Sequence, residues 1–127
     1  MYVTQVRIVH TNGSNETSTW TDPWINKYIF PGSLLPSIQQ IDQSIEGLFV
    51  MEDWHNFSAH YDKTLLAWHE NFNKNWGQLE MIFADPFQRL WNYCLLTCAG
   101  SFRARKNQLW QIVLSKIGVP GGYESIR

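Results

Sequence analysis

Short apolar runs alternate with apolar positions at helical spacing along this chain of 127 residues. Residues 5–9 form an apolar run that predicts a strand, and residues 109–114 form another. Between them, Leu48 to Met51 is a continuous apolar run, which is typical of a strand covered on both faces. The chain therefore carries three candidate strands.

Three helices are predicted between these strands. The first begins near Pro36, because proline is favoured in the first turn of a helix, and it ends at Gly47. The second carries one apolar stripe, with Gly77 beyond its end. That stripe consists of Tyr61, Leu65, Trp68, Phe72 and Trp76. The third helix begins near Pro86 and ends in the basic segment 100–105, which complements the helix dipole.

The predicted order is strand, helix, strand, helix, helix, strand, which indicates an α/β architecture with helices packed on the sheet. Three strands alone make a poor open sheet, because both of its edges stay exposed. We therefore interpret residues 1–127 as a single partial domain that forms the second half of a larger sheet. Residues 11–33 are a long polar and aromatic connection, which in a compact domain is usually functional or a lid.

The composition narrows the class of protein. Hydrophobic residues make up 44% and charged residues 17%, as in an ordinary globular protein rather than a disordered one. The net charge of −1 gives no reason to expect a nucleic-acid partner. No apolar stretch has the length of a signal-peptide core or the roughly 20 residues of a membrane-spanning helix. We expect a cytoplasmic protein.

The two cysteines, Cys94 and Cys98, lie one turn apart on the third predicted helix. A disulfide between them would close almost no loop and would fit the required geometry poorly. We expect both cysteines to be reduced and buried, and to act as small apolar residues.

His10 follows the first predicted strand and opens the polar segment His-Thr-Asn-Gly-Ser. Open α/β sheets build ligand sites just outside the carboxyl ends of their strands, so His10 is a candidate site residue. The alternative is a structural histidine whose hydrogen bonds are satisfied within the fold.

Three further groups of residues invite a functional interpretation. Glu52, Asp53, Trp54 and His55 end the second predicted strand, where they either line the site or anchor the next loop. His55, His60 and His69 have no carboxylates or cysteines at metal-ligand spacing, so no metal site is expected. Beside Lys27, four aromatic residues either enter a membrane interface or, as we favour, pack over a missing half of the protein. They are Trp20, Trp24, Tyr28 and Phe30.

Several sequence blocks resemble the C-terminal part of cyclopropane-fatty-acyl-phospholipid synthases. The blocks are His10-Thr11, Asp22 to Pro31, Leu35-Pro36-Ser37, Glu52 to Phe57, Ala99-Gly100, Phe102 to Arg105 and Gln108 to Gln111. The resemblance runs from about Val6 to Leu114 and covers the last third of a family member. Enzymes of this family convert cis double bonds in the acyl chains of membrane phospholipids into cyclopropane rings, with S-adenosylmethionine as the methyl donor.

The resemblance implies the C-terminal half of a class I, Rossmann-like methyltransferase fold, whose first half binds S-adenosylmethionine. The glycine-rich loop and the ribose-binding acidic residue of that first half have no counterpart in this sequence. Residues 118–122 are glycine-rich, but they follow the last strand instead of joining a strand to a helix. We assign no cofactor-binding residue to this chain. We expect it to be inactive alone, and to form a homo-oligomer or to pair with an N-terminal half.

The resemblance also implies a site for bicarbonate, the base that removes a proton as the ring closes. His10 matches the bicarbonate-binding histidine of the family, and Tyr61 matches its tyrosine. Asn12 falls at a third position, where the family normally has an isoleucine that contacts the ion through its backbone. The implied catalytic residues are therefore His10 and Tyr61. Core packing is the alternative for Tyr61, because it heads the apolar stripe of its helix.

The implied function is transfer of a methylene group from S-adenosylmethionine to unsaturated phospholipid at the membrane surface. The enzyme would be cytoplasmic and peripherally associated with the membrane. Two alternatives stay open. One is a non-catalytic module that binds lipid or a partner, and the other is part of a fatty-acid methyltransferase that does not close the ring.

Overall fold

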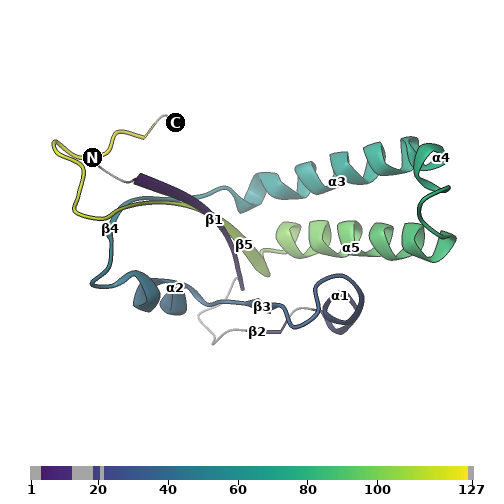
Figure 1. Ribbon diagram of the computed structural model, residues 1–127, viewed down its shortest axis with the longest axis horizontal. Helices are drawn as coiled ribbons and strands as arrows, with labels where there is room; N and C mark the ends of the chain where they lie inside the picture. Colours follow the sequence, from purple (N-terminus) through teal and green to yellow (C-terminus); the bar gives the residue numbers. More distant parts are fainter. Residues whose placement is uncertain (1–3, 13–18, 21, 126–127) are drawn as a thin grey trace.

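The computed structural model describes residues 4–12, 19–20 and 22–125, with side chains from residue 22 onward. Its strands are β1 (Thr4–Asn12), β2 (Thr19–Trp20), β3 (Leu34–Leu35), β4 (Val50–Asn56) and β5 (Asn107–Ser115). Its helices are α1 (Pro23–Tyr28), α2 (Ile38–Ile45), α3 (Ser58–Lys74), α4 (Trp76–Leu79) and α5 (Asp85–Arg103). Helices α3 and α5 extend side by side from the sheet as a hairpin, with α4 at its far end (Figure 1).

The main sheet has three antiparallel strands in the order β1-β5-β4. Because β1 and β4 both run opposite to β5, their carboxyl ends lie at the edge of the sheet where β5 begins. At this edge Asn12 is opposite Asn107, and Asn56 is opposite Trp110. Helix α3 starts directly after β4, so its first turn belongs to the same edge. A separate two-stranded ribbon is formed by β2 and β3.

The hydrophobic core lies between the helical hairpin and β5. It consists of Leu65 from α3, Leu95, Ala99 and Phe102 from α5, and Leu109 from β5. Within β5, Ile112 and Val113 are also buried. The apolar stripes of α3 and α5 thus face each other and the central strand, which is the arrangement that buries most of their apolar surface.

The predicted elements are confirmed, with some shifts in their bounds. The strands at residues 5–9 and 109–114 correspond to β1 and β5, and the three predicted helices correspond to α2, α3 and α5. At the end of α2, Gly47 has a positive φ of 72°, which glycine adopts without steric cost. Residue Gly77 lies within the short helix α4 instead of beyond a longer α3.

One expectation from the sequence is corrected. The run from Leu48 to Met51 is not a strand covered on both faces, because β4 begins at Val50 and Leu48 is 63% exposed. Strand β4 is at an edge of the described sheet, and the doubly covered strand is the central β5. The connection 11–33 contains two short elements that the sequence analysis did not predict, β2 and α1. The Asp22 carboxylate caps α1 by accepting from the backbone N–H groups of Trp24 and Ile25, at 2.9 and 3.2 Å.

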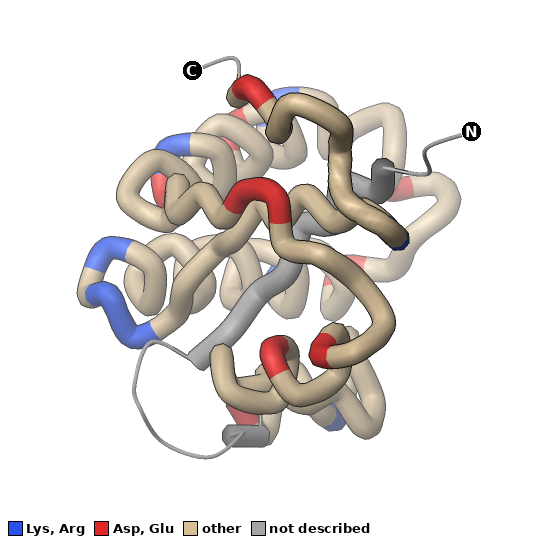
Figure 2. The backbone as a smooth tube through the Cα atoms, turned by 90° about the vertical axis from the view of Figure 1, so that its left-hand side faces the viewer, with Lys and Arg blue, Asp and Glu red and all other residues tan. Residues whose placement is uncertain are grey.

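Acidic and basic residues are scattered in short stretches along the backbone (Figure 2). Among the described residues, no helix has the length and apolar character needed to cross a membrane.

Candidate functional site

A cavity of about 340 Å³ lies at the edge of the sheet where β5 begins. Its walls come from the segment 22–35, from α3, from α5 and from Asn107 at the start of β5. Aromatic rings make up much of the lining, and they are Phe30, Tyr61, Trp68, Trp91 and Phe102. The volume is at the lower end of the roughly 300 to 1,000 Å³ that ligand pockets occupy. The site therefore suits a mostly apolar ligand of modest size.

Tyr61 is on the first turn of α3 and faces this cavity. The start of α3 is fixed to the sheet through Ser58, which is fully buried. The backbone N–H of Leu109 donates to Ser58 Oγ at 2.6 Å, and the Asn56 side chain accepts from the Ser58 backbone N–H at 3.0 Å. These contacts hold the beginning of α3 against β5, and so they place Tyr61 at the wall of the cavity.

The Tyr61 ring packs against two other aromatic rings that line the cavity. It meets Phe102 edge to face with ring centroids 5.0 Å apart, and Trp68 with centroids 6.0 Å apart. Burial raises the pKa of the Tyr61 phenol, and the nearby Cys98 thiol adds to this shift. At neutral pH the phenol is therefore protonated, and it can donate a hydrogen bond to an anion in the cavity.

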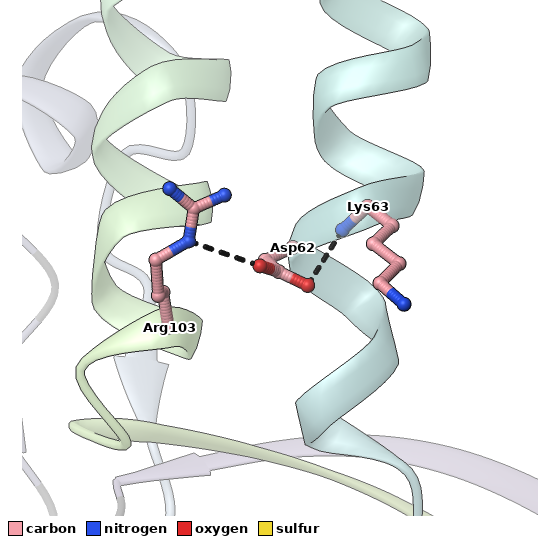
Figure 3. A network of polar contacts seen from close by, with 3 residues as sticks. All are labelled: Asp62, Lys63 and Arg103. Carbon is pink, nitrogen blue, oxygen red and sulfur yellow. Dashed lines mark hydrogen bonds and ion pairs between the residues drawn. The ribbon is translucent and has the colours of Figure 1, made fainter.

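An ion pair joins α3 to α5 next to Tyr61. Arg103 Nε lies 3.1 Å from Asp62 Oδ2, and the backbone N–H of Lys63 donates to Asp62 Oδ1 at 2.7 Å (Figure 3). The hydrogen bond from Arg103 is the main cause of the lowered pKa of Asp62. Since Tyr61 precedes Asp62 and Phe102 precedes Arg103, the ion pair and the ring contact link the same turns of the two helices. Sequence reasoning missed this pair, whose members are 41 positions apart.

The structure brings the end of β1 to the same edge of the sheet as Tyr61. The backbone of His10 is opposite Leu109, and the backbone of Asn12 is opposite Asn107, which lines the cavity. Leu109 in turn contacts Ser58 at the start of α3. The side chains of His10 and Asn12 lie outside the described residues. The register alone therefore places the two predicted positions of β1 near the first turn of α3.

Glu52, Asp53, Trp54 and His55 are within β4, and they are not among the described residues that line the cavity. The Glu52 carboxylate accepts from Ser115 Oγ and from the backbone N–H of Val119, the latter at 2.8 Å. Trp54 packs edge to face on Trp110, and His55 packs near Phe57. Glu52 thus anchors the segment that follows β5.

Both cysteines are free thiols, as the sequence predicted, and both line the cavity. The Cys94 thiol is buried, and its hydrogen bond to Cys98 raises the pKa of Cys94. Their role in the cavity wall was missed, although Trp91, Cys94, Cys98 and Phe102 recur on α5 at helical spacing. In the described part of the chain, no group of three His, Cys, Asp or Glu side chains lies close enough to hold a metal ion.

Two solved structures share this fold. The cyclopropane synthase MmaA2 from Mycobacterium tuberculosis superposes with a TM-score of 0.72 at 21% identity, over 91% of this chain and 44% of that one. The mycolic acid cyclopropane synthase CmaA1, complexed with SAH and CTAB, gives a TM-score of 0.68 at 25% identity, over 87% of this chain and 44% of that one. The three-stranded sheet with its helical hairpin is therefore a partial methyltransferase fold.

Two relatives identified by sequence are likewise a cyclopropane synthase and a methyltransferase. The cyclopropane-fatty-acyl-phospholipid synthase of Escherichia coli K12 is 52% identical over 120 residues, which are 94% of this chain and 31% of the relative. The tuberculostearic acid methyltransferase UfaA1 of Mycobacterium tuberculosis is 36% identical over 104 residues, or 79% of this chain and 24% of the relative. The chain thus spans less than a third of the length of these relatives.

The fold and these relatives define the class as methyltransferases. Within that class, the family model described as mycolic acid cyclopropane synthetase matches residues 1–112, so the chain belongs to this family. The predicted resemblance to cyclopropane synthases is confirmed.

Proposed function

We propose that this chain forms the acyl-binding part of a cyclopropane synthase, which transfers a methylene group from S-adenosylmethionine to the cis double bond of phospholipid acyl chains. The observation that carries the proposal is the aromatic cavity with the Tyr61 phenol in its wall. An acyl chain is apolar, as the lining of this cavity requires. The 52% identity to the Escherichia coli synthase supports the same substrate class.

The reaction makes two demands on the residues around the double bond. The alkene forms a bond to the sulfonium methyl carbon as the carbon–sulfur bond breaks, which leaves a positive charge on the acyl chain. A base then takes a proton from the new methyl group, and the ring closes. The rings of Trp68, Trp91 and Phe102 line the cavity and are suited to stabilise the cation.

Bicarbonate fits this site as the base, because Tyr61 offers a neutral phenol that can donate a hydrogen bond to an anion. We assign its binding to His10, Asn12 and Tyr61, the first two by the register of β1 at the same edge of the sheet. When bound, bicarbonate supplies a proton acceptor beside the new methyl group. His10 and Tyr61 are the proposed catalytic residues. S-adenosylmethionine supplies the methyl group, and no residue of this chain is assigned to hold it.

We further propose that these 127 residues do not transfer methyl groups alone, and that they act with the remaining part of such an enzyme or as an oligomer. The chain spans 31% of the Escherichia coli relative, and large apolar side chains such as Leu48 and Ile117 are exposed. We place the working enzyme in the cytoplasm, peripherally associated with the membrane that holds its substrate. Sedimentation of the isolated chain as a clean monomer that binds no hydrophobic dye would argue against the oligomer.

The test is a chimaera in which this chain replaces the matched 120 residues of the Escherichia coli synthase. We expect transfer of label from methyl-labelled S-adenosylmethionine to vesicles of cis-unsaturated phospholipid in the presence of bicarbonate. The chain alone is expected to transfer none. A folded chimaera that leaves the lipid unlabelled would contradict the proposal and favour a non-catalytic module. Label transferred by the chain alone would contradict its proposed inactivity.

A second candidate function is methylation of the acyl chain without ring closure, which the 36% identity to the methyltransferase UfaA1 favours. Both reactions add one carbon to the lipid, so the label does not distinguish them. Magnetic resonance of the product does, because ring methylene protons differ from those of a branched methyl group. We expect the ring.

A further inference from the structure

An aromatic patch lies on the outside of α1 and α5. Trp24, Tyr28 and Tyr93 are 52%, 49% and 42% exposed. The Trp24 ring centroid lies 4.8 Å from that of Tyr28 and 5.6 Å from that of Tyr93. The three rings therefore form one contiguous surface, although they come from two helices that are far apart in the sequence.

This aromatic patch adjoins the cavity. Asp22 and Ile25, which flank Trp24 in the chain, both line the cavity wall. Phe30 also lines the cavity and yet is 53% exposed, so it marks a point where the cavity opens to the outside. Leu34 and Trp68 combine the same two properties. A surface that covers the patch therefore also meets the mouth of the cavity.

One lysine and one carboxylate lie beside the patch. Lys27 Nζ lies 4.9 Å from the centroid of the Tyr28 ring, and Lys27 is the only charged residue within α1. The nearby Asp22 carboxylate is engaged, because it accepts from the backbone of α1 and from the Tyr93 hydroxyl at 3.4 Å. Exposed Trp and Tyr rings beside a lysine match the boundary between phosphate headgroups and acyl chains of a bilayer.

We propose that the aromatic patch, with Lys27, is the docking surface for a phospholipid bilayer. Lys27 contacts the lipid phosphates, the rings lie at the headgroup boundary, and one acyl chain enters the cavity past Phe30. The inference rests on the proposed function, since it takes the cavity as the acyl site. A protein segment or second copy over the patch would close the mouth, whereas a bilayer brings the substrate to it. For this reason the proposal departs from the packing over a missing half that the sequence analysis favoured for Trp24, Tyr28 and Phe30.

The experiment is flotation of the full 127-residue chain with vesicles of cis-unsaturated phosphatidylcholine and phosphatidylglycerol. The double variant Trp24→Ala/Tyr28→Ala is expected to lower the partition coefficient about tenfold. The matched control is Met81→Ser/Ile82→Ser, which removes strongly exposed apolar side chains that do not line the cavity. They belong to the turn between α4 and α5, at the end of the helical hairpin away from the sheet (Figure 1). The control is expected to bind the vesicles as the unaltered chain does. Circular dichroism confirms that each variant is folded.

A second variant tests the charge while keeping all three aromatic rings of the patch. Lys27→Gln is expected to weaken binding about fivefold on vesicles that contain phosphatidylglycerol, and to leave binding to pure phosphatidylcholine unchanged. Several outcomes would overturn the proposal. They are unchanged binding of the Trp24/Tyr28 variant, an equal loss in the Met81/Ile82 control, and a dimer that dissociates when Trp24 and Tyr28 are replaced while neither form binds vesicles.

Flotation needs no methyl transfer, so its failure is distinguishable from failure of the proposed function. A chimaera that binds vesicles through Trp24 and Tyr28 but leaves the lipid unlabelled would overturn the catalytic proposal and retain the docking surface. A chimaera that labels the lipid equally well with and without these rings would overturn the docking surface and retain the catalytic proposal.

Discussion

Tyr61 and Phe102 meet edge to face, with ring centroids 5.0 Å apart, where α3 and α5 both reach the cavity. Phe102 is almost completely buried in the core, whereas Tyr61 is half-buried and turns its ring to the cavity. The contact thus joins the part of the molecule that stabilises the fold to the part proposed to act on lipid. We therefore expect a substitution at Tyr61 to change chiefly the bicarbonate dependence, and one at Phe102 to change chiefly the free energy of unfolding.

Tyr61→Phe is expected to weaken bicarbonate binding in the chimaera with the Escherichia coli synthase. The substitution keeps the ring packing and removes only the hydroxyl. A hydrogen bond to a charged group contributes about 1.5–3 kcal/mol, so the bicarbonate concentration for half-maximal activity should rise about ten- to hundredfold. Excess bicarbonate should restore the rate. As a control, Trp68→Phe alters the neighbouring ring and should leave the bicarbonate dependence unchanged.

Phe102→Ala is expected to lower the free energy of unfolding by about 3–5 kcal/mol, because it leaves a void in the core between Leu95 and Leu109. Chemical denaturation followed by circular dichroism measures the change. Phe102→Leu retains most of the apolar volume and should cost less. A loss of under about 1 kcal/mol for Phe102→Ala would show that this core is looser than its burial indicates.

Asp62→Asn is expected to destabilise the fold near neutral pH and much less in acid. The folded-state pKa of Asp62 is lowered from 3.8, chiefly by the hydrogen bond from Arg103. The Asp62 carboxylate therefore stabilises the fold fully above its unfolded-state pKa. This stabilisation is lost as the pH falls through the lower folded-state pKa. Urea denaturation from about pH 7 to about pH 3 should show the difference from the unaltered chain shrinking below about pH 4.

The control for Asp62 is Asn92→Ala, which removes another contact between α3 and α5. Asn73 Nδ2 donates to Asn92 Oδ1 at 2.7 Å, and neither group titrates in this range. The destabilisation by Asn92→Ala should therefore be the same at both ends of the pH range. If the two variants respond alike to pH, the ion pair with Arg103 does not account for the effect of Asp62.

Ser58→Ala is expected to cost about 1–3 kcal/mol of folding free energy, since the buried N–H of Leu109 loses its acceptor. Ser44→Ala is the matched control. Its hydroxyl donates to the Gln40 carbonyl at an exposed position of α2, and its removal should change stability by under about 0.5 kcal/mol. Equal effects in equilibrium denaturation would contradict the role given to Ser58 at the start of α3.

Local pattern was sufficient to predict α2, α3, α5 and two of the main strands, but not the short helices α1 and α4. The stripe from Tyr61 to Trp76 and the one on α5 follow helical spacing, which depends only on backbone geometry. The same reasoning failed for Leu48 to Met51, because an apolar run does not reveal whether a strand is central or at an edge. That property depends on which strands pair, and β4 pairs only with β5 in the described sheet.

The candidate site likewise has residues that the sequence predicts and contacts that only the tertiary structure shows. Motif resemblance was enough to select His10, Asn12 and Tyr61, because these residues lie in recognisable local sequence blocks. No local pattern pairs Asp62 with Arg103 or Glu52 with Val119, whose members are 41 and 67 positions apart. The sequence by itself determined the longer helices, two of the main strands, the family and the residues proposed to bind bicarbonate. The tertiary structure decided which faces are covered, where the cavity lies and which distant side chains meet, since these depend on contacts that close only when the helical hairpin packs on β5.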